Sequence, residues 1–289
     1  MTSARAASIH ARLLNLARER GEDFNLIVVR YATERFLYRL STIQAVRDAL
    51  WLKGAMLFDL WFDMPHRPTR DADFLGFGLI DVNLLAGTVR EICGVAVDDG
   101  MVFDPMSVVV DDIREHARYG GLRVRLKGTL GNARCVVQLD VGYGDAVTPG
   151  PEDVAYPTLL DDMPTPRLHV YPRATVVAEK LEAIVSLGMA NSRLKDYFDL
   201  RALAREGASD ERQLAQAIAA TFVRRGTALP QGLPLGLTEE FANDAAKVAQ
   251  WNAFLGKNRL HAPALADVVE ELAQFLRTPL RLARGESEA

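Results

Sequence analysis

The chain has 289 residues, of which 49% are hydrophobic and 25% are charged. A chain of this length forms one large domain or two modest ones, since domains average roughly 150 residues, and its composition is that of a folded protein rather than a disordered one. The formal net charge of −4 excludes a protein that coats nucleic acid through bulk charge, although a local basic groove stays compatible with it.

Membrane insertion and secretion are also disfavoured. No apolar run approaches the roughly 18 residues that a membrane-spanning helix needs, and the N-terminal segment has no hydrophobic core before a small-residue cleavage site. The two cysteines, Cys93 and Cys135, form no CxxC motif and are typical of a reduced compartment. We therefore expect a cytoplasmic protein that does not bind membranes.

The first half of the chain is predicted to mix helices and strands. Apolar residues at helical spacing predict helices over residues 3–20, 24–40, 42–49, 56–62 and 80–93, and alternation predicts strands over 50–52, 71–77, 108–110, 122–127 and 133–141, with a turn at 128–132. Pro65 and Pro68 mark a loop. Arg123, Arg125 and Lys127 alternate with apolar residues, which predicts a half-buried strand whose basic outer face could guide an RNA backbone.

The second half is predicted to be helical after an irregular connection. Six prolines lie between residues 149 and 172, which predicts irregular chain there. Helical patterns follow over residues 174–187, 195–206, 209–225, 238–255 and 263–277, with a Pro/Gly linker over 226–236. We therefore expect an α+β domain over residues 1–150 and a mainly helical domain over residues 151–289.

Asp71 and Asp73 form the densest chemical signal. Residues i and i+2 of a strand share a face, so both carboxylates point the same way and repel each other unless a cation lies between them. Mg²⁺ prefers such oxygen ligands together with substrate phosphates. A D-x-D pair is also common as two solvated residues at a strand edge, and that interpretation stays open on this motif alone.

The surroundings of the aspartates favour a metal site for nucleotidyl transfer. Gly54 lies between a predicted strand and a predicted helix, where backbone N–H groups can receive phosphate. Asp140 lies on another strand, on the face opposite the one that its apolar neighbours share. In-line displacement at phosphorus requires charge neutralised on the attacking and leaving oxygens, which carboxylate-bound ions supply, and a third carboxylate can also act as base.

Lys180 forms a second signal, because the helical spacing of its neighbours places it inside an apolar arc. It either reaches past the core to water or serves an interior anionic site. Asp199 is expected to be partly buried and to need a partner, for which Lys180 and Lys195 are candidates, whereas Asp196 is explained equally well by stabilisation of a helix start. A purely structural ion pair between Lys180 and Asp199 stays open.

These segments together resemble the AbiEii/AbiGii toxin family. The resemblance rests on Lys53-Gly54-Ala55, the run from His66 to Asp73, the Ala178–Leu181 segment and the Lys195–Leu200 segment, in that order, and it covers about residues 10–280. It implies a bilobed protein with a DNA-polymerase-β-like nucleotidyltransferase core and a helical C-terminal lobe. It also implies a toxin of a type IV toxin–antitoxin or phage-defence system, with an AbiEi-type antitoxin as its genetic partner.

The resemblance further implies roles for individual residues. Asp71 and Asp73 match the metal-binding pair, with Asp140 assigned to the same set by its strand position. Lys180 matches the motif lysine for nucleotide phosphates and Asp199 the last acidic motif residue. The segments that match the family's nucleotide-binding motifs supply Lys53, Gly54, Ala55, Thr69, Arg70, Lys180, Lys195 and Asp196. Ala55 replaces the serine of the wider superfamily, so backbone amides must bind phosphate there.

The expected function is a Mg²⁺- or Mn²⁺-dependent transfer of NMP from an NTP to an RNA acceptor. The tRNA 3′ end is the favoured acceptor, and its modification would inhibit translation. Two alternatives stay open: transfer to a protein or small-molecule hydroxyl, and a non-catalytic binding module in which the aspartates are structural.

Overall fold

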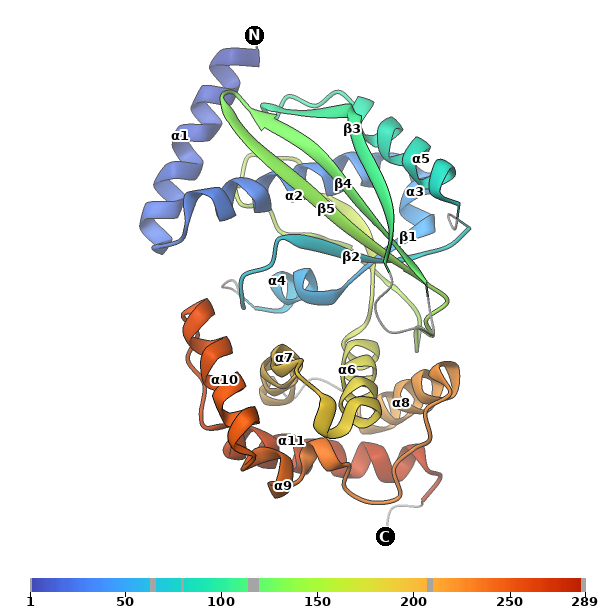
Figure 1. Cartoon of the computed structure of the whole chain (residues 1–289). Helices are drawn as coiled ribbons and strands as arrows, with labels where there is room; N and C mark the ends of the chain where they lie inside the picture. The colour runs from blue at the N-terminus through green and yellow to red at the C-terminus, as the bar shows by residue number, and fades with distance from the viewer. Residues whose placement is uncertain (1, 63–65, 79–80, 114–119, 207–209, 287–289) are drawn as a thin grey trace. The chain divides into compact units, whose positions relative to one another are not determined.

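A computed structural model describes residues 2–62, 66–78, 81–113, 120–206 and 210–286. The chain divides into two compact units (Figure 1): the first comprises residues 1–144 and 152–170, and the second comprises residues 145–151 and 171–289. The expected division at residue 150 differs from these units in two segments. Residues 145–150 belong to the second unit, and residues 152–170 return to the first unit and add two strands to its sheet.

The first unit is a mixed sheet with helices packed against it. Its elements are α1 (Thr2–Arg20), α2 (Phe24–Thr42), α3 (Gln44–Ala49), β1 (Leu50–Lys53), the 3-10 helix η1 (Gly54–Leu57), α4 (Phe58–Trp61), β2 (Asp71–Gly76), α5 (Val82–Gly94), β3 (Met101–Ile113), β4 (Gly121–Leu130), β5 (Ala133–Tyr143), β6 (Glu152–Ala155) and β7 (Arg167–Val170). The seven strands lie in the order β3-β4-β5-β2-β1-β7-β6. This α+β sheet confirms the expected fold class.

Two long-range strand pairings fix the centre of the sheet. β2 pairs with β5 in parallel and with β1 antiparallel, while β1 pairs in parallel with β7. Ala72, Phe74, Leu139 and Val141 are buried on one face, and α2 packs against β5. Alternation then turns the intervening residues of β2 and β5 to the opposite face, where the polar side chains lie.

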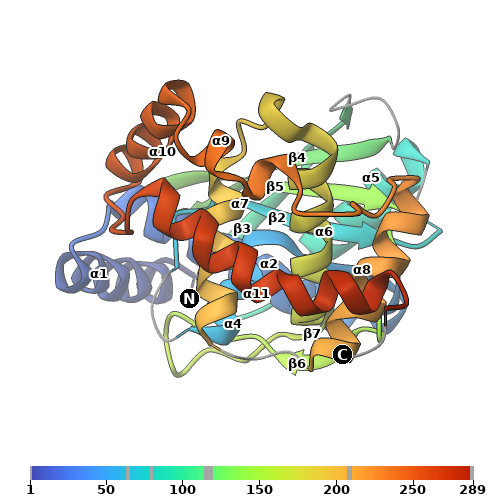
Figure 2. The same ribbon diagram turned by 90° about the horizontal axis from the view of Figure 1, so that it is seen from below.

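The second unit is helical. Its elements are α6 (Arg173–Leu187), η2 (Gly188–Ala190), α7 (Leu194–Arg205), α8 (Glu211–Arg225), η3 (Leu235–Leu237), α9 (Glu239–Ala242), α10 (Ala245–Asn258) and α11 (Leu265–Ala283). Figure 2 shows α11 running across α7 and α8, and both pairs are in contact. The core contains Val268, Leu272 and Leu276 of α11, which recur at helical spacing and are fully or almost fully buried.

Three predictions from the sequence were incomplete. β3 runs from Met101 to Ile113 rather than over 108–110, because an edge strand with a register shift between Asp104 and Val109 tolerates Pro105. β6 and β7 lie in the segment predicted to be irregular, where each strand is only four residues long. The helix predicted over 238–255 is two helices, because the side chain of Asp244 caps the start of α10. Pro65, and the predicted helix starts at residues 80 and 209, lie outside the described residues.

Among the helices described, none is long and apolar enough to cross a membrane.

A buried ion pair holds α2 against the segment that precedes β3. The Nη2 atom of Arg39 donates to Oδ1 of Asp99 over 3.0 Å and to the Met101 carbonyl over 3.2 Å, and Nη1 donates to the second oxygen of Asp99. Asp99 also accepts from the Met101 N–H over 3.0 Å. Both side chains are almost fully buried, so each charge depends on the other for compensation.

We expect Asp99→Ala to destabilise the protein by about 3–5 kcal/mol, because the guanidinium of Arg39 would stay buried without its counter-charge. Urea denaturation measures the free energy of unfolding. Asp111→Ala removes a solvent-exposed ion pair with Arg125 and is the matched control, with little expected change. A similarly small effect of both substitutions would contradict the importance of this pair.

Candidate active site

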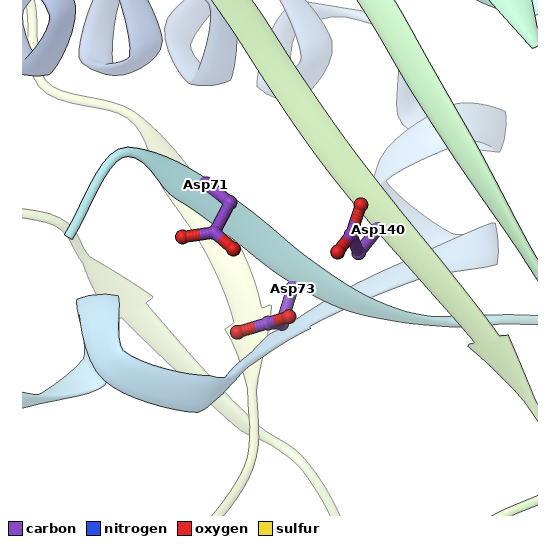
Figure 3. A group of neighbouring side chains, drawn as sticks. All are labelled: Asp71, Asp73 and Asp140. Carbon is purple, nitrogen blue, oxygen red and sulfur yellow. The ribbon is translucent and has the colours of Figure 1, made fainter. Parts of the chain in front are cut away.

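Asp71, Asp73 and Asp140 converge on one face of the central sheet. The parallel register of β2 and β5 sets Asp73 directly opposite Asp140 and Asp71 opposite Gln138. One carboxylate oxygen of each aspartate lies within 4.8 Å of those of the other two, and Figure 3 shows the three carboxylates turned toward a common space. All three residues are partly exposed, so this group is accessible to a cation.

The local sequence explains why the three carboxylates share this face. Ala72 and Phe74 alternate with the two aspartates of β2 and are fully buried. Leu139 and Val141 flank Asp140 in the same way. Burial of these four apolar residues therefore turns three like charges to one side, where their repulsion is relieved only by positive charge.

Gly54 brings the turn after β1 against Asp73. Its φ is +76°, in the left-handed region that favours glycine, and a Cβ built on it would lie 2.0 Å from Oδ2 of Asp73. No side chain fits at this position without moving the carboxylate. The backbone at Gly54 therefore approaches the Asp73 carboxylate closely, and phosphate binding at this turn stays a prediction.

Lys53 lies on the same face as the carboxylates. It is paired in register with Asp73 across β1 and β2, and its Nζ atom lies 3.6 Å from the position of a Cβ built on Gly142. The missing side chain of Gly142, two residues after Asp140, leaves room for the lysine. The backbone thus brings an ammonium group close to the acidic group.

Arg123 neutralises Asp140, and the sequence analysis did not identify this pair. Nε of Arg123 donates to Oδ1 of Asp140 over 2.8 Å, and Nη2 donates to Oδ2 over 2.7 Å. Arg125 pairs with Asp111 instead. Two of the three basic residues that were expected to guide RNA are therefore engaged with carboxylates, and Arg123 belongs to the acidic site.

Thr69 contacts the first aspartate. Its hydroxyl donates to Oδ1 of Asp71 over 3.0 Å, which restrains the carboxylate at the start of β2. Arg70, the next residue, is exposed, whereas Ala55, beside Gly54, is half-buried. These residues all belong to the first unit.

In the second unit, Lys180 lies between two buried carboxylates. Its Nζ atom donates to Oδ1 of Asp196 over 2.8 Å and to Oδ2 of Asp199 over 2.7 Å. Arg193 donates from Nε to the other oxygen of Asp196 over 2.7 Å. Both aspartates are fully buried and the lysine side chain is 11% exposed, so α6 and α7 are joined by a compact charged cluster.

The electrostatics of this cluster favour the charged forms of Lys180 and Asp196. Burial alone would lower the pKa of Lys180, but Asp196 and Asp199 together hold it above its ordinary value. Burial alone would raise the pKa of Asp196, yet Lys180 and Arg193 keep it below its ordinary value. The expectation that Lys180 lies inside an apolar arc is correct, and the partner of Asp199 is Lys180 rather than the exposed Lys195.

The fold and the acidic group define a class of protein. A mixed sheet with a glycine turn after one strand, a D-x-D pair on the next and a third aspartate on a parallel neighbour is a DNA-polymerase-β-like nucleotidyltransferase core. A family profile described as the nucleotidyl transferase AbiEii toxin of type IV toxin–antitoxin systems matches residues 35–277. The chain therefore belongs to the AbiEii family and is a toxin nucleotidyltransferase. Toxins of this class are paired with an antitoxin.

One solved structure supports the fold. A Helicobacter pylori protein described as a nucleotidyltransferase is 15% identical, with a TM-score of 0.50 over 91% of this chain and 98% of that one. JHP933 from Helicobacter pylori is also 15% identical, with a TM-score of 0.49 over 90% of this chain and 94% of that one. No curated protein sequence matches the chain.

Gly54→Ala is expected to displace Asp73 and abolish nucleotidyl transfer, because the added Cβ overlaps that carboxylate. Activity and thermal unfolding should be measured together. Gly78→Ala is the matched control, since Gly78 has a φ of +72° but open space around it. Gly78→Ala should lose about 1–2 kcal/mol of stability from the left-handed backbone, and Gly54→Ala should lose more because of the overlap with Asp73. Loss of activity in both variants would argue against a specific role for the turn.

Arg123→Ala is expected to increase the affinity for Mn²⁺ several-fold in the absence of nucleotide, because it removes the cation that competes for Asp140. Calorimetric titration with Mn²⁺ measures this affinity. Arg125 lies on the same strand as Arg123, and its exposed partner Asp111 lies on β3. Arg125→Ala breaks that pair and should leave the affinity for Mn²⁺ unchanged. Unaltered or weaker binding by the Arg123 variant would show that Asp140 is not a ligand.

Proposed function

We propose that this toxin is a Mg²⁺-dependent nucleotidyltransferase that moves an NMP from an NTP to a hydroxyl of RNA. The favoured acceptor is the 3′ end of tRNA, whose modification would block translation. The observation that supports this most directly is the approach of carboxylate oxygens from Asp71, Asp73 and Asp140 to within 4.8 Å of one another.

The donor set fits a hard divalent cation. Mg²⁺ and Mn²⁺ take carboxylate oxygens together with phosphate oxygens, and all three side chains here offer oxygen. Asp71 and Asp73 would hold the ions, and Asp140 would complete the set or act as base. When bound, the ions supply neutralisation of charge on the attacking and leaving oxygens.

The chain's own residues would position the reactants. The acceptor oxygen forms a bond to the α-phosphorus, the bond from that phosphorus to the bridging oxygen breaks, pyrophosphate leaves, and the acceptor proton passes to a carboxylate or to solvent. The triphosphate would lie along the segment from Lys53 to Ala55, where the glycine turn exposes backbone to it. Thr69 and Arg70, which directly precede Asp71 in the sequence, would lie near it.

We also propose that the charged cluster of the second unit binds phosphate. Lys180 would neutralise phosphate charge, while Asp199 and Asp196 fix the position of its ammonium group. Lys195 is exposed on α7 and would add positive charge. A structural role alone would predict that Lys180→Gln lowers stability without changing affinity for NTP.

Family membership supports a proposal about the biological setting. Type IV systems pair the toxin with an antitoxin, and we propose an AbiEi-type repressor as the partner in a phage-defence locus. Expression of the toxin alone should therefore inhibit growth.

Asp71→Asn and Asp73→Asn are each expected to lower nucleotidyl transfer by roughly 10³-fold and to relieve growth inhibition. Labelled NTPs incubated with total RNA or with total protein identify the acceptor, and EDTA should abolish labelling. Asp153→Asn changes an exposed aspartate of β6 that pairs with Arg167 and is the control. Label in protein would favour a protein hydroxyl, and toxicity that survives both substitutions would identify a binding module.

A further inference from the structure

A pocket of about 170 Å³ lies beside the acidic group in the first unit. The end of α1, α2, η1, α4, the start of β2 and the segment 156–159 line it. It includes Asp71 but not Gly54, Asp73 or Asp140. A ligand in this pocket would therefore meet the acidic group only at Asp71, away from the glycine turn proposed for the triphosphate.

The walls of the pocket combine positive charge with apolar surface. Arg20 is exposed at its rim, and its side chain forms no hydrogen bond or ion pair with another described residue. Arg70, which is proposed above to lie near the triphosphate, is also exposed there. Met56 and Phe62 contribute apolar surface. Phosphodiester groups bind such arginines, and nucleobases stack on aromatic rings, so the lining matches one nucleotide unit.

The floor of the pocket is a rigid polar network. The Tyr156 hydroxyl donates to Oδ2 of Asp59 over 3.1 Å and to the Met56 carbonyl over 3.2 Å, and Arg30 pairs with the same oxygen of Asp59 over 3.2 Å. Glu34 is 3% exposed and accepts from the Leu159 N–H over 2.6 Å. These contacts hold α2, α4 and the segment 156–159 together, so the pocket is formed before any ligand binds.

The size of the pocket restricts its ligand. It is smaller than the roughly 300–1,000 Å³ of pockets that enclose a whole small-molecule ligand. It accommodates one ring system of a larger molecule rather than a complete nucleoside triphosphate.

We propose that this pocket binds the terminal nucleotide of the RNA acceptor and presents its hydroxyl to Asp71. The proposal rests on the proposed function, since it names the acceptor subsite of the same centre. Arg20 binds the backbone phosphate, and Phe62 supports the base. The pocket thereby separates the acceptor from the NTP, which lies on the glycine-turn side of the carboxylates.

Steady-state kinetics with varied tRNA and varied NTP test the proposal. Arg20→Glu and Phe62→Leu should each raise the KM for tRNA about tenfold or more while leaving the KM for NTP unchanged. Phe62→Leu keeps apolar volume and removes the aromatic face, and thermal unfolding verifies its folding. Arg18→Glu reverses an exposed charge two residues earlier on α1, outside the pocket, and should behave as wild type.

A crosslinking experiment needs no turnover and separates the ligand sources. The Asp71→Asn variant is irradiated with tRNA that carries 4-thiouridine as its terminal nucleotide, or with a photoreactive NTP, and the modified peptide is mapped. Crosslinks from the tRNA to Phe62 or to the segment 156–159 support the proposal, and crosslinks from the NTP to those residues overturn it.

The outcomes also distinguish this proposal from the proposed function. If wild-type protein labels tRNA but the Arg20 and Phe62 variants keep the wild-type KM for tRNA, the pocket is not the acceptor subsite and the nucleotidyltransferase assignment stands. If no RNA is labelled and protein or small molecules are, the proposed acceptor fails and the pocket proposal fails with it.

Discussion

Parallel pairing of β2 with β5 is the constraint on which the site depends. It places Asp73 directly opposite Asp140, and the alternation of buried residues then forces Asp71 onto the same face. Three carboxylates within 4.8 Å repel each other, so the arrangement costs stability unless cations lie close by. Arg123 supplies one such charge at Asp140, and Lys53 lies on the same face, opposite Asp73.

In the helical unit, a buried positive charge is compensated by carboxylates. One ammonium group, that of Lys180, is removed from water and lies between the carboxylates of Asp196 and Asp199. Arg193 adds a second positive charge to Asp196, so the cluster has two charges of each sign. An isolated lysine in this position would lose its proton, whereas here the neighbouring carboxylates hold its pKa above the ordinary value.

The sequence predicted the parts of the site that depend on local periodicity. Alternation identified the shared face of Asp71 and Asp73, and helical spacing placed Lys180 inside the core. The Arg123–Asp140 pair could also have been predicted from the sequence. A two-residue turn at Gly131-Asn132 sets Leu130 opposite Ala133 and therefore Arg123 opposite Asp140. The parallel pairings of β2 with β5 and β1 with β7 join distant segments and leave no local signal. The short strand β7 among prolines was missed for that reason.

Asp140 of the acidic group and each charged group of the Lys180 cluster already have a partner of opposite sign, and this affects how substrates would bind. A cation that binds Asp140 in place of Arg123 would release a guanidinium that can contact phosphate. A phosphate that contacts Lys180 would compete with carboxylates that are already ordered. In either exchange the total charge around each group changes little, so the surrounding chain needs no large rearrangement. Preorganised charges of this kind stabilise charge that develops during reaction at low reorganisation cost. The ion pairs of the free protein therefore fix the geometry in which such an exchange can occur.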